Sequence, residues 1–407
     1  MSAKPSNPPS AGSGVSSRVK RVELIKKLEA ARGGRLLVSY VTSTRSGHEI
    51  QMADDVLRLL FEHLESGKEA ARKGIDLLIH SNGGSGTVPW RLVSLIREYT
   101  KNFAVLVPHK AFSAATLVAL GADEILMHRM GCLGPIDPSV ANIFNPPHPQ
   151  IPGQPAPISV EDVTAYFKLI KEDVGITHED ELVQAFLALA EKVHPLALGN
   201  VQRHHNQSRL MASKLLRMHM PPDQEHEISQ IVENLKSNLF FHGHPISRRE
   251  ARDDLKLKVK DPDPAVEELM WAVYEEYEND LSLKSPLQGL HELDSRGLLA
   301  PVGATLTTQD IVKQMVQLQQ YGVALGAVAP QQLVELAAAM LPIVSSPGRP
   351  RPRIELRSVR GAILESSART DVFLSDLAFE RISIPSSSGP QDAIKQESLW
   401  HRWEEER

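Results

Sequence analysis

The chain has 407 residues, of which 42% are hydrophobic and 23% charged, and it is long enough for two or three soluble domains. Its formal net charge of −5 gives no general electrostatic reason to bind nucleic acid. Because the chain has one cysteine, Cys132, we exclude an internal disulfide and a thiolate metal cluster.

Helices and strands alternate in the first third of the chain. After a Ser/Pro/Gly-rich segment at 1–17, which we expect to be disordered, helical spacing begins at residue 18 and is ended by the glycines at 33–34. Apolar strands are expected at 35–43, 75–81, 103–109 and 123–129, and helices at 48–64, 87–100 and 113–122. Strands of parallel sheets are almost wholly apolar because helices cover both faces. The pattern therefore predicts an α/β fold with a mostly parallel sheet.

The composition of the remaining sequence predicts its organisation. A proline-rich loop at 145–157 leads into a mostly helical stretch, and a helix at 263–278 closes the main domain. We expect a disordered tail at 1–17, the main domain at 18–280, a helical extension at 281–344, a basic linker at 345–353 and a C-terminal segment at 354–407. The last segment has strand character at first, and we expect its polar end from residue 386 to be mobile.

The apolar runs are too short to span a bilayer. The run LVELAAAMLPIV at 333–344 falls short of the roughly 18 residues that a spanning helix needs. The first 17 residues lack the apolar core of a secretory signal. We expect a soluble, cytoplasmic protein without a transmembrane segment.

Two loops follow strands of the predicted sheet, HSNGGSGT at 80–87 and HKAFSAAT at 109–116. Ligands of parallel α/β sheets bind beyond the carboxyl ends of the strands. If the two strands are neighbours, Ser113 lies at the same sheet edge as Gly83 and Gly84. The N–H groups of a glycine and of Ala114 would then form an oxyanion hole for a carbonyl group that Ser113 attacks.

A structural role fits the same residues. A serine at the start of a helix is commonly an N-cap, and a Gly-Gly turn is common after a strand. The A-F-S-A-A sequence around Ser113 also differs from the G-x-S-x-G nucleophile elbow. Residue spacing alone therefore leaves both roles of Ser113 open.

Several motifs in order give the sequence a family resemblance. They are S-x-G-G after a strand, A-x-S-A before an apolar helix, A-D-E-I, L-G-P-I-D-P, and PISRREA followed by LKLKV. Over residues 18–260 the chain resembles the SDH-type (serine dehydrogenase proteinase) family of Clp-fold serine proteinases. This family is related to signal peptide peptidase A within the Clp/crotonase superfamily.

The resemblance implies a Clp/crotonase-like spiral of β-β-α turns with a C-terminal extension outside it. It implies a serine endopeptidase that hydrolyses peptide or protein substrates through an acyl-enzyme on Ser113. Gly83 or Gly84, together with Ala114, would supply the oxyanion hole. Relatives assemble into closed rings, which implies a homo-oligomer, and no cofactor is implied.

Two features depart from the family pattern. Ala115 stands where the family usually has glycine, and its methyl group could crowd the helix or the substrate. The proton acceptor is not evident, because Pro138 occupies the position of the Clp histidine and Lys168, Lys192 and Lys214 are no more than candidates for a lysine base. A catalytic lysine must be buried to lower its pKa.

Histidines in the second half of the chain invite a metal interpretation. They lack a carboxylate at matching spacing, so we expect packing or surface roles and no metal site for His194, His204, His205, His242 and His244.

Two other functions stay open. A catalytically degenerate Clp-fold protein that scaffolds or binds would explain the missing base and Ala115. A crotonase-type acyl-CoA enzyme would need a CoA site, for which the sequence offers no supporting carboxylate pair. The C-terminal extension fits a partner-binding role in each case.

Overall fold

The computed structural model describes residues 13–136, 139–140, 142–147, 155–156, 158–237, 244–295, 353–384 and 391–406. The chain divides into two compact units. The first contains the residues up to 286 together with 360–374 and 402–407, and the second contains 287–359 and 375–401.

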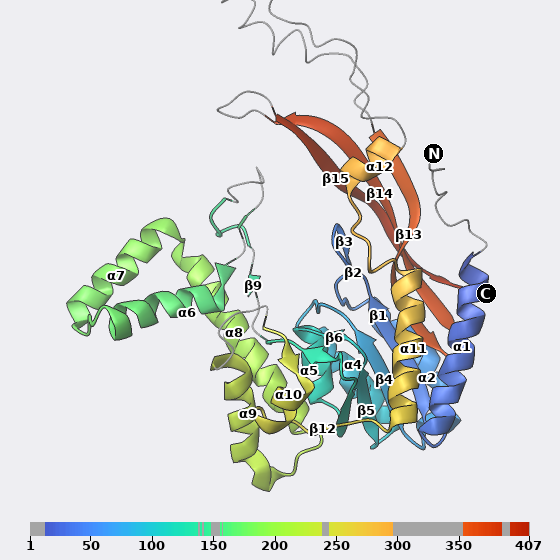
Figure 1. Cartoon of the computed structure of the whole chain (residues 1–407). Coiled ribbons are helices and arrows are strands. Elements are labelled where there is room, and N and C mark those ends of the chain that lie inside the picture. Colours follow the sequence, from blue (N-terminus) through green and yellow to red (C-terminus); the bar gives the residue numbers. More distant parts are fainter. Residues whose placement is uncertain are drawn as a thin grey trace, which may run out of the picture. The chain divides into compact units, whose positions relative to one another are not determined.

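A mostly parallel sheet forms the centre of the first unit (Figure 1). Its strand order is β12-β7-β5-β4-β1-β13-β14-β15. The parallel strands are β1 (Leu36–Thr42), β4 (Ile75–His80), β5 (Phe103–Val107), β7 (Glu124–Met127) and β12 (Val259–Lys260). The prediction of an α/β fold with a mostly parallel sheet is confirmed, and the first four of these strands lie where the apolar runs predict them.

Helices bury both faces of this sheet. In β4, Leu77 and Ile79 belong to one hydrophobic cluster and Leu78 to another, because successive side chains point to opposite faces. The Leu78 face is covered by α1 (Ser13–Ala31) and α11 (Pro264–Asp280). The opposite face is covered by α2 (Val56–Ser66), α4 (Val88–Tyr99) and α5 (Ala114–Leu120), and α3 (Lys68–Ala71) follows α2. Since α1 begins at Ser13, the expectation that all of 1–17 is disordered is wrong at its last residues.

Local sequence signals account for several helix starts. Pro89 lies in the first turn of α4, where a missing N–H is harmless. Ser247 caps α10 (Arg248–Asp253) in a reciprocal capping box with Glu250. α10 leads into β12, which pairs with β7 and extends the parallel sheet.

Short strands and a run of helices complete the first unit. The short strands are β2 (Thr44–Arg45), β3 (His48–Glu49), β6 (Lys110–Ala111), β8 (Cys132–Leu133), β9 (Ser139–Val140), β10 (Ile158–Ser159) and β11 (Ile246–Ser247). The helical run contains α6 (Val160–Lys168), η1 (Leu169–Asp173), α7 (Glu179–Lys192), α8 (Pro195–Leu216), η2 (Pro222–Gln224) and α9 (Glu225–Ser237).

Three long strands near the C-terminus, red in Figure 1, continue the sheet: β13 (Arg353–Ser366), β14 (Thr370–Ile384) and β15 (Gln391–Glu405). β13 runs antiparallel to β1, with Val38 opposite Ser366 and Thr42 opposite Ala362. The expectation of a mobile polar end is wrong for β15, which lies within it. Polar residues of this strand have partners in the fold; Trp403, for example, donates its indole N–H to Asp55 at 2.8 Å.

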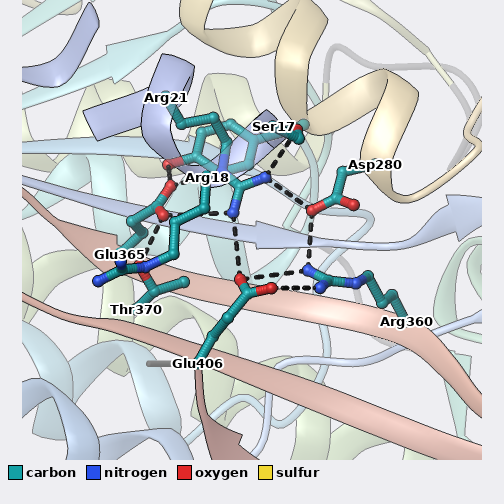
Figure 2. Close-up of polar contacts among 9 residues, drawn as sticks. Ser17, Arg18, Arg21, Asp280, Arg360, Glu365, Thr370 and Glu406 are labelled. Carbon is teal, nitrogen blue, oxygen red and sulfur yellow. Dashed lines mark hydrogen bonds and ion pairs between the residues drawn. The ribbon is translucent and has the colours of Figure 1, made fainter. Parts of the chain in front are cut away.

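A buried ion-pair network joins the N-terminal helix to these strands within the first unit (Figure 2). The Arg21 side chain is 0% exposed and contacts Glu365 and Asp280, each at 2.7 Å. Arg360 contacts Asp280 at 2.9 Å and also pairs with Glu406. A buried charge is tolerated only when it is paired, so the network fixes α1, α11 and the C-terminal strands together.

The second unit has a small core of its own. Leu287, Leu293, Ile354, Leu377 and Phe379 form this hydrophobic cluster, to which α12 (Gly289–Ser295) contributes. Most of the helical extension and linker predicted for 281–353 lies outside the described residues.

Candidate active site

The loops after β4 and β5 are hydrogen-bonded to each other. Ser81 donates its N–H to the carbonyl of Lys110, and Phe112 donates its N–H to the carbonyl of Ser81, both at 3.0 Å. Because β4 and β5 are adjacent parallel strands, their carboxyl ends bring Ser113 and the Gly83–Gly84 turn to one edge of the sheet.

Gly83 lies directly against Ser113. A Cβ atom added to Gly83 would be 2.7 Å from the Cβ of Ser113 and 2.8 Å from the carbonyl oxygen of Phe112. The φ angle of Gly83 is 103°, a value that residues with side chains rarely adopt. A side chain at Gly84 would collide with the backbone of Met52, which pairs with this turn through hydrogen bonds to Gly83 and Ser85.

Two hydroxyl groups behind the turn fix its conformation. Thr42 donates to the Ser81 hydroxyl at 2.9 Å, and that hydroxyl accepts the N–H of Gly83 at 3.0 Å. The Gly83 N–H is therefore already used. Ser81 is the first residue of the S-x-G-G motif. Its role behind the turn could not be predicted from the sequence, because it depends on which strands are neighbours.

The Gly84 and Ala114 N–H groups differ from that of Gly83, since neither donates a hydrogen bond to another described residue. Ala114 is the first residue of α5, where the N–H has no partner within the helix. The N atom of Ala114 would be 3.0 Å from a Cβ at Gly83, so it lies beside the turn.

Ser113 has a strained backbone, with φ of 52° and ψ of −113°. Such a conformation in a residue other than glycine costs on the order of 1–3 kcal/mol. Although Ser113 stands at the N-cap position of α5, its side chain makes no capping hydrogen bond. Its hydroxyl has no hydrogen-bond partner among the residues that the structure describes. The capping role that spacing left open therefore does not explain this serine.

The α5 helix after Ser113 is wholly buried. Ala115 is 0% exposed and packs in the main hydrophobic core, so its methyl group does not reach a substrate at the surface. Thr116 donates its hydroxyl to the carbonyl of Ala111 at 2.6 Å and accepts the N–H of Gly134 at 3.1 Å. These bonds fix α5 against the Gly134 segment, and sequence reasoning did not identify Thr116.

The three lysines considered as proton acceptors are exposed. Lys168 is at the end of α6, Lys192 at the end of α7, and Lys214 in α8, with its ammonium group over the ring of Trp90 at 5.3 Å. A lysine that serves as a general base has to be removed from solvent, and these three side chains are exposed. The geometry therefore does not support any of them as the base.

Two histidines at the carboxyl ends of β4 and β5 were not singled out by the sequence. The rings of His80 and His109 stack with their centroids 5.4 Å apart, and Nδ1 of His109 lies 2.7 Å from the hydroxyl of Tyr274. Burial lowers the pKa of His80 well below its usual value, and burial followed by the charge of Lys110 lowers the pKa of His109. Both imidazoles are therefore neutral near pH 7, but neither is hydrogen-bonded to Ser113 in the described structure.

The histidines considered for a metal are dispersed. His194 stacks on Phe144, His205 is buried in α8, and His244 pairs with Glu250 at 2.7 Å. His242 lies outside the described residues. In the described ranges, no group of three or more His, Cys, Asp or Glu side chains is arranged to hold a metal ion. Within the same ranges, no helix is both long and apolar enough to cross a bilayer.

Comparisons with known proteins match part of the chain. The family model described as ClpP-like SDH-type serine proteinase matches residues 49–188. An uncharacterized protein of Methanocaldococcus jannaschii is 29% identical over 181 residues, which cover 44% of this chain and 52% of the relative. A second uncharacterized protein of that organism is 28% identical over 130 residues, covering 30% of this chain and 43% of the relative. The chain thus spans about half the length of the curated relatives that it matches.

The matched segment contains β4, β5, α5 and the strained serine between the last two. Its parallel sheet and helices agree with the Clp/crotonase fold that the resemblance implies. By fold, motif order and family model, residues 49–188 are similar to the ClpP-like SDH-type serine proteinases.

Proposed function

We propose that the chain is a serine endopeptidase in which Ser113 is the nucleophile. The observation that carries this proposal is the backbone of Ser113, which is held at a φ of 52° beside Gly83 without serving as a cap. Strain that no packing role explains is typical of residues that act in chemistry. The family model over residues 49–188 supports the same reaction class.

The reaction follows from the atoms at the sheet edge. The Ser113 oxygen attacks the carbonyl carbon of a peptide bond, a C–O bond forms, and the hydroxyl proton passes to a base. The tetrahedral intermediate collapses when its C–N bond breaks, and the proton goes to the leaving amine. Water then attacks the acyl-enzyme and releases the acid product.

The Gly84 and Ala114 N–H groups are the proposed oxyanion donors. The Gly83 N–H is assigned to Ser81, so Gly84 is the better of the two glycines considered. Each donor aimed at a developing oxyanion contributes about 3 kcal/mol to the stability of the transition state.

The exposure of Lys168, Lys192 and Lys214 favours a second candidate, a Clp-fold protein that binds polypeptides without cleaving them. A fluorophosphonate probe separates the two, because it phosphonylates only an activated serine. We expect labelling of the full chain and none of Ser113→Ala. Ser85→Ala, which removes an exposed hydroxyl from the neighbouring loop, is the matched control and should label normally. A folded protein that takes up no probe would favour the binding protein.

The assembly and compartment belong to the same proposal. The substrates of the protein are peptides or proteins. The protein acts as a homo-oligomer, as Clp-type relatives do, and it acts in the cytoplasm without a cofactor. Sedimentation of the purified full chain tests the assembly, since a monomer at every concentration would contradict a homo-oligomer.

A further inference from the structure

Helix α7 presents apolar side chains on nearly all sides, yet none of its residues is buried. Its sequence between Leu182 and Ala190 is LVQAFLALA, with Gln184 as the only polar residue. A helix that is apolar around its circumference is normally covered by other structure. Val183 is 56% exposed, Phe186 43% and Leu187 55%, so the described residues leave this helix uncovered.

One side of α7 is held by α6, and both helices are green in Figure 1. Tyr166 donates its hydroxyl to the carbonyl of Ala185 at 3.1 Å, and the rings of Phe167 and Phe186 stack with centroids 6.4 Å apart. These contacts cover Phe186 only in part, since it remains 43% exposed, and Val183 and Leu187 beside it on the helix surface are 56% and 55% exposed. We call Val183, Phe186 and Leu187 the α7 apolar strip.

Carboxylates flank the α7 apolar strip at both ends. Glu179 lies four residues before Val183 and Glu191 four residues after Leu187, so each is one turn from the strip on its face of the helix. The two are about 18 Å apart along the axis. No ion pair involves either of them within the described chain.

The surroundings of the strip are acidic as well. Residues 162–192 contain seven carboxylates (Asp162, Glu172, Asp173, Glu179, Asp180, Glu181, Glu191) and three lysines (Lys168, Lys171, Lys192), a net charge of −4. The whole chain has a net charge of −5, so this segment carries an excess of negative charge for its length. An apolar centre with a charged rim is the usual anatomy of a polypeptide-binding surface.

We propose that the α7 apolar strip docks a cationic, apolar polypeptide segment, with side chains such as leucine on the strip and lysine or arginine near Glu179 and Glu191. A second copy of α7 is a poorer occupant. Two such helices packed antiparallel about a two-fold axis would bring Glu179 near Glu191 of the partner subunit, which sets like charges together. Docking of the polypeptide segment does not use Ser113. Only its later cleavage rests on the proposed peptidase activity.

The test uses the full chain with Ser113→Ala and fluorescence anisotropy of two labelled peptides. Both have a Leu-Ala-Phe-Leu centre; one has two lysines at each end and the other two glutamates. We expect the lysine peptide to bind at least about tenfold more tightly and its affinity to fall with added salt. Equal affinity for the two peptides would overturn the proposal.

Variants locate the binding on α7. Leu187→Asp, and separately Glu179→Lys with Glu191→Lys, should each weaken the lysine peptide by about tenfold. The controls are Leu210→Asp, at a leucine of α8 that is 52% exposed, and Asp223→Lys with Glu227→Lys near α9. Far-UV circular dichroism checks that every variant is folded, and controls that weaken binding as much as the α7 variants would overturn the proposal.

Two further outcomes identify other occupants. A thiol of Leu187→Cys that reacts with a maleimide as slowly as a buried thiol in the free monomer would mean that another segment of this chain covers the strip. Dissociation of an oligomer by Leu187→Asp would mean that a second copy covers it. Either result contradicts the proposal, whereas failure of fluorophosphonate labelling with normal peptide docking would contradict only the peptidase.

Discussion

Ser113 and Gly83 pack directly against each other. The turn after β4 approaches Ser113, whose φ is 52°, so closely that only a residue without Cβ fits at position 83. Met52, Ser81 and Thr42 hold that turn from behind through short hydrogen bonds. The position of the proposed nucleophile is therefore set by backbone packing and not by a hydrogen bond of its own.

Gly83→Ala should abolish labelling of Ser113 by fluorophosphonate. The new methyl would be 2.7 Å from the Cβ of Ser113, so one of the two backbones must move. Gly86→Ala, three residues along the same loop, is the control, since a Cβ there meets no atom within 4 Å. Equal labelling of the two variants, measured by intact mass, would mean that the contact does not position the serine.

Much of this site could be predicted from the sequence, because one rule of parallel sheets applies to it. Carboxyl ends of adjacent parallel strands meet, so Ser113 and the glycines could be expected together. The hydroxyls of Ser81, Thr42 and Thr116 could not be identified, because a small polar residue in a loop has many possible partners. The exposure of Lys168 could not be predicted either, since burial depends on packing that helical spacing does not determine.

At the scale of elements, Glu267 connects α11 to the end of β7. It accepts the N–H of Arg129 at 2.9 Å, pairs with the Arg129 guanidinium at 2.6 Å and contacts Arg248 at 3.2 Å. The hydrogen bond from the Arg129 side chain, together with the N–H and the charge of Arg129, lowers the pKa of Glu267 from its ordinary value of 4.5 to about 2. The helix is thus held to the sheet by an ionised carboxylate.

Acid should weaken this connection in a defined range. A carboxylate whose pKa is lower in the folded protein contributes its full stability above pH 4.5 and loses it as the pH falls towards 2. Urea unfolding of wild type and Glu267→Gln should therefore differ at pH 6 and converge near pH 2. The exposed neighbour Glu268, changed to Gln, is the control. A difference between wild type and Glu267→Gln that does not change with pH would contradict the assignment.

The parallel elements were predictable and the C-terminal ones were not, for a physical reason. Apolar runs such as 103–109 indicate strands that are covered on both faces. β15 is rich in charged residues and lies at the edge of the sheet, where a strand is stabilised by pairing that its own sequence does not reveal. The polar composition of this segment therefore predicted a mobile tail, whereas the structure has a strand there.

At the scale of the first unit, chain segments far apart in sequence share one buried network. Arg21 and Glu365 are 344 residues apart, and the side chains of both are 0% exposed. Tyr277 adds a hydrogen bond to Glu365 at 2.7 Å. Residues 360–374 and 402–407, which include the ends of the C-terminal strands that carry this network, are in this way part of the unit that contains Ser113.

Arg21→Met should destabilise the protein by about 3–5 kcal/mol, because it leaves the Glu365 carboxylate buried without its partner. Adding Glu365→Gln should recover part of the loss, since the amide is neutral and still accepts from Tyr277. Lys20→Met, which removes the neighbouring exposed pair with Glu276, should have little effect. Urea unfolding followed by circular dichroism measures all three, and equal losses for Arg21→Met and Lys20→Met would contradict the network's role.

The nucleophilic role of Ser113 is the central claim, and one measurement tests it directly. The full chain is treated with a fluorophosphonate, its intact mass is measured, and the modified peptide is sequenced by tandem mass spectrometry. The account predicts a single phosphonyl group on Ser113 and no mass increase for Ser113→Ala. An unmodified folded protein, or a group on any other serine that persists in Ser113→Ala, would contradict it.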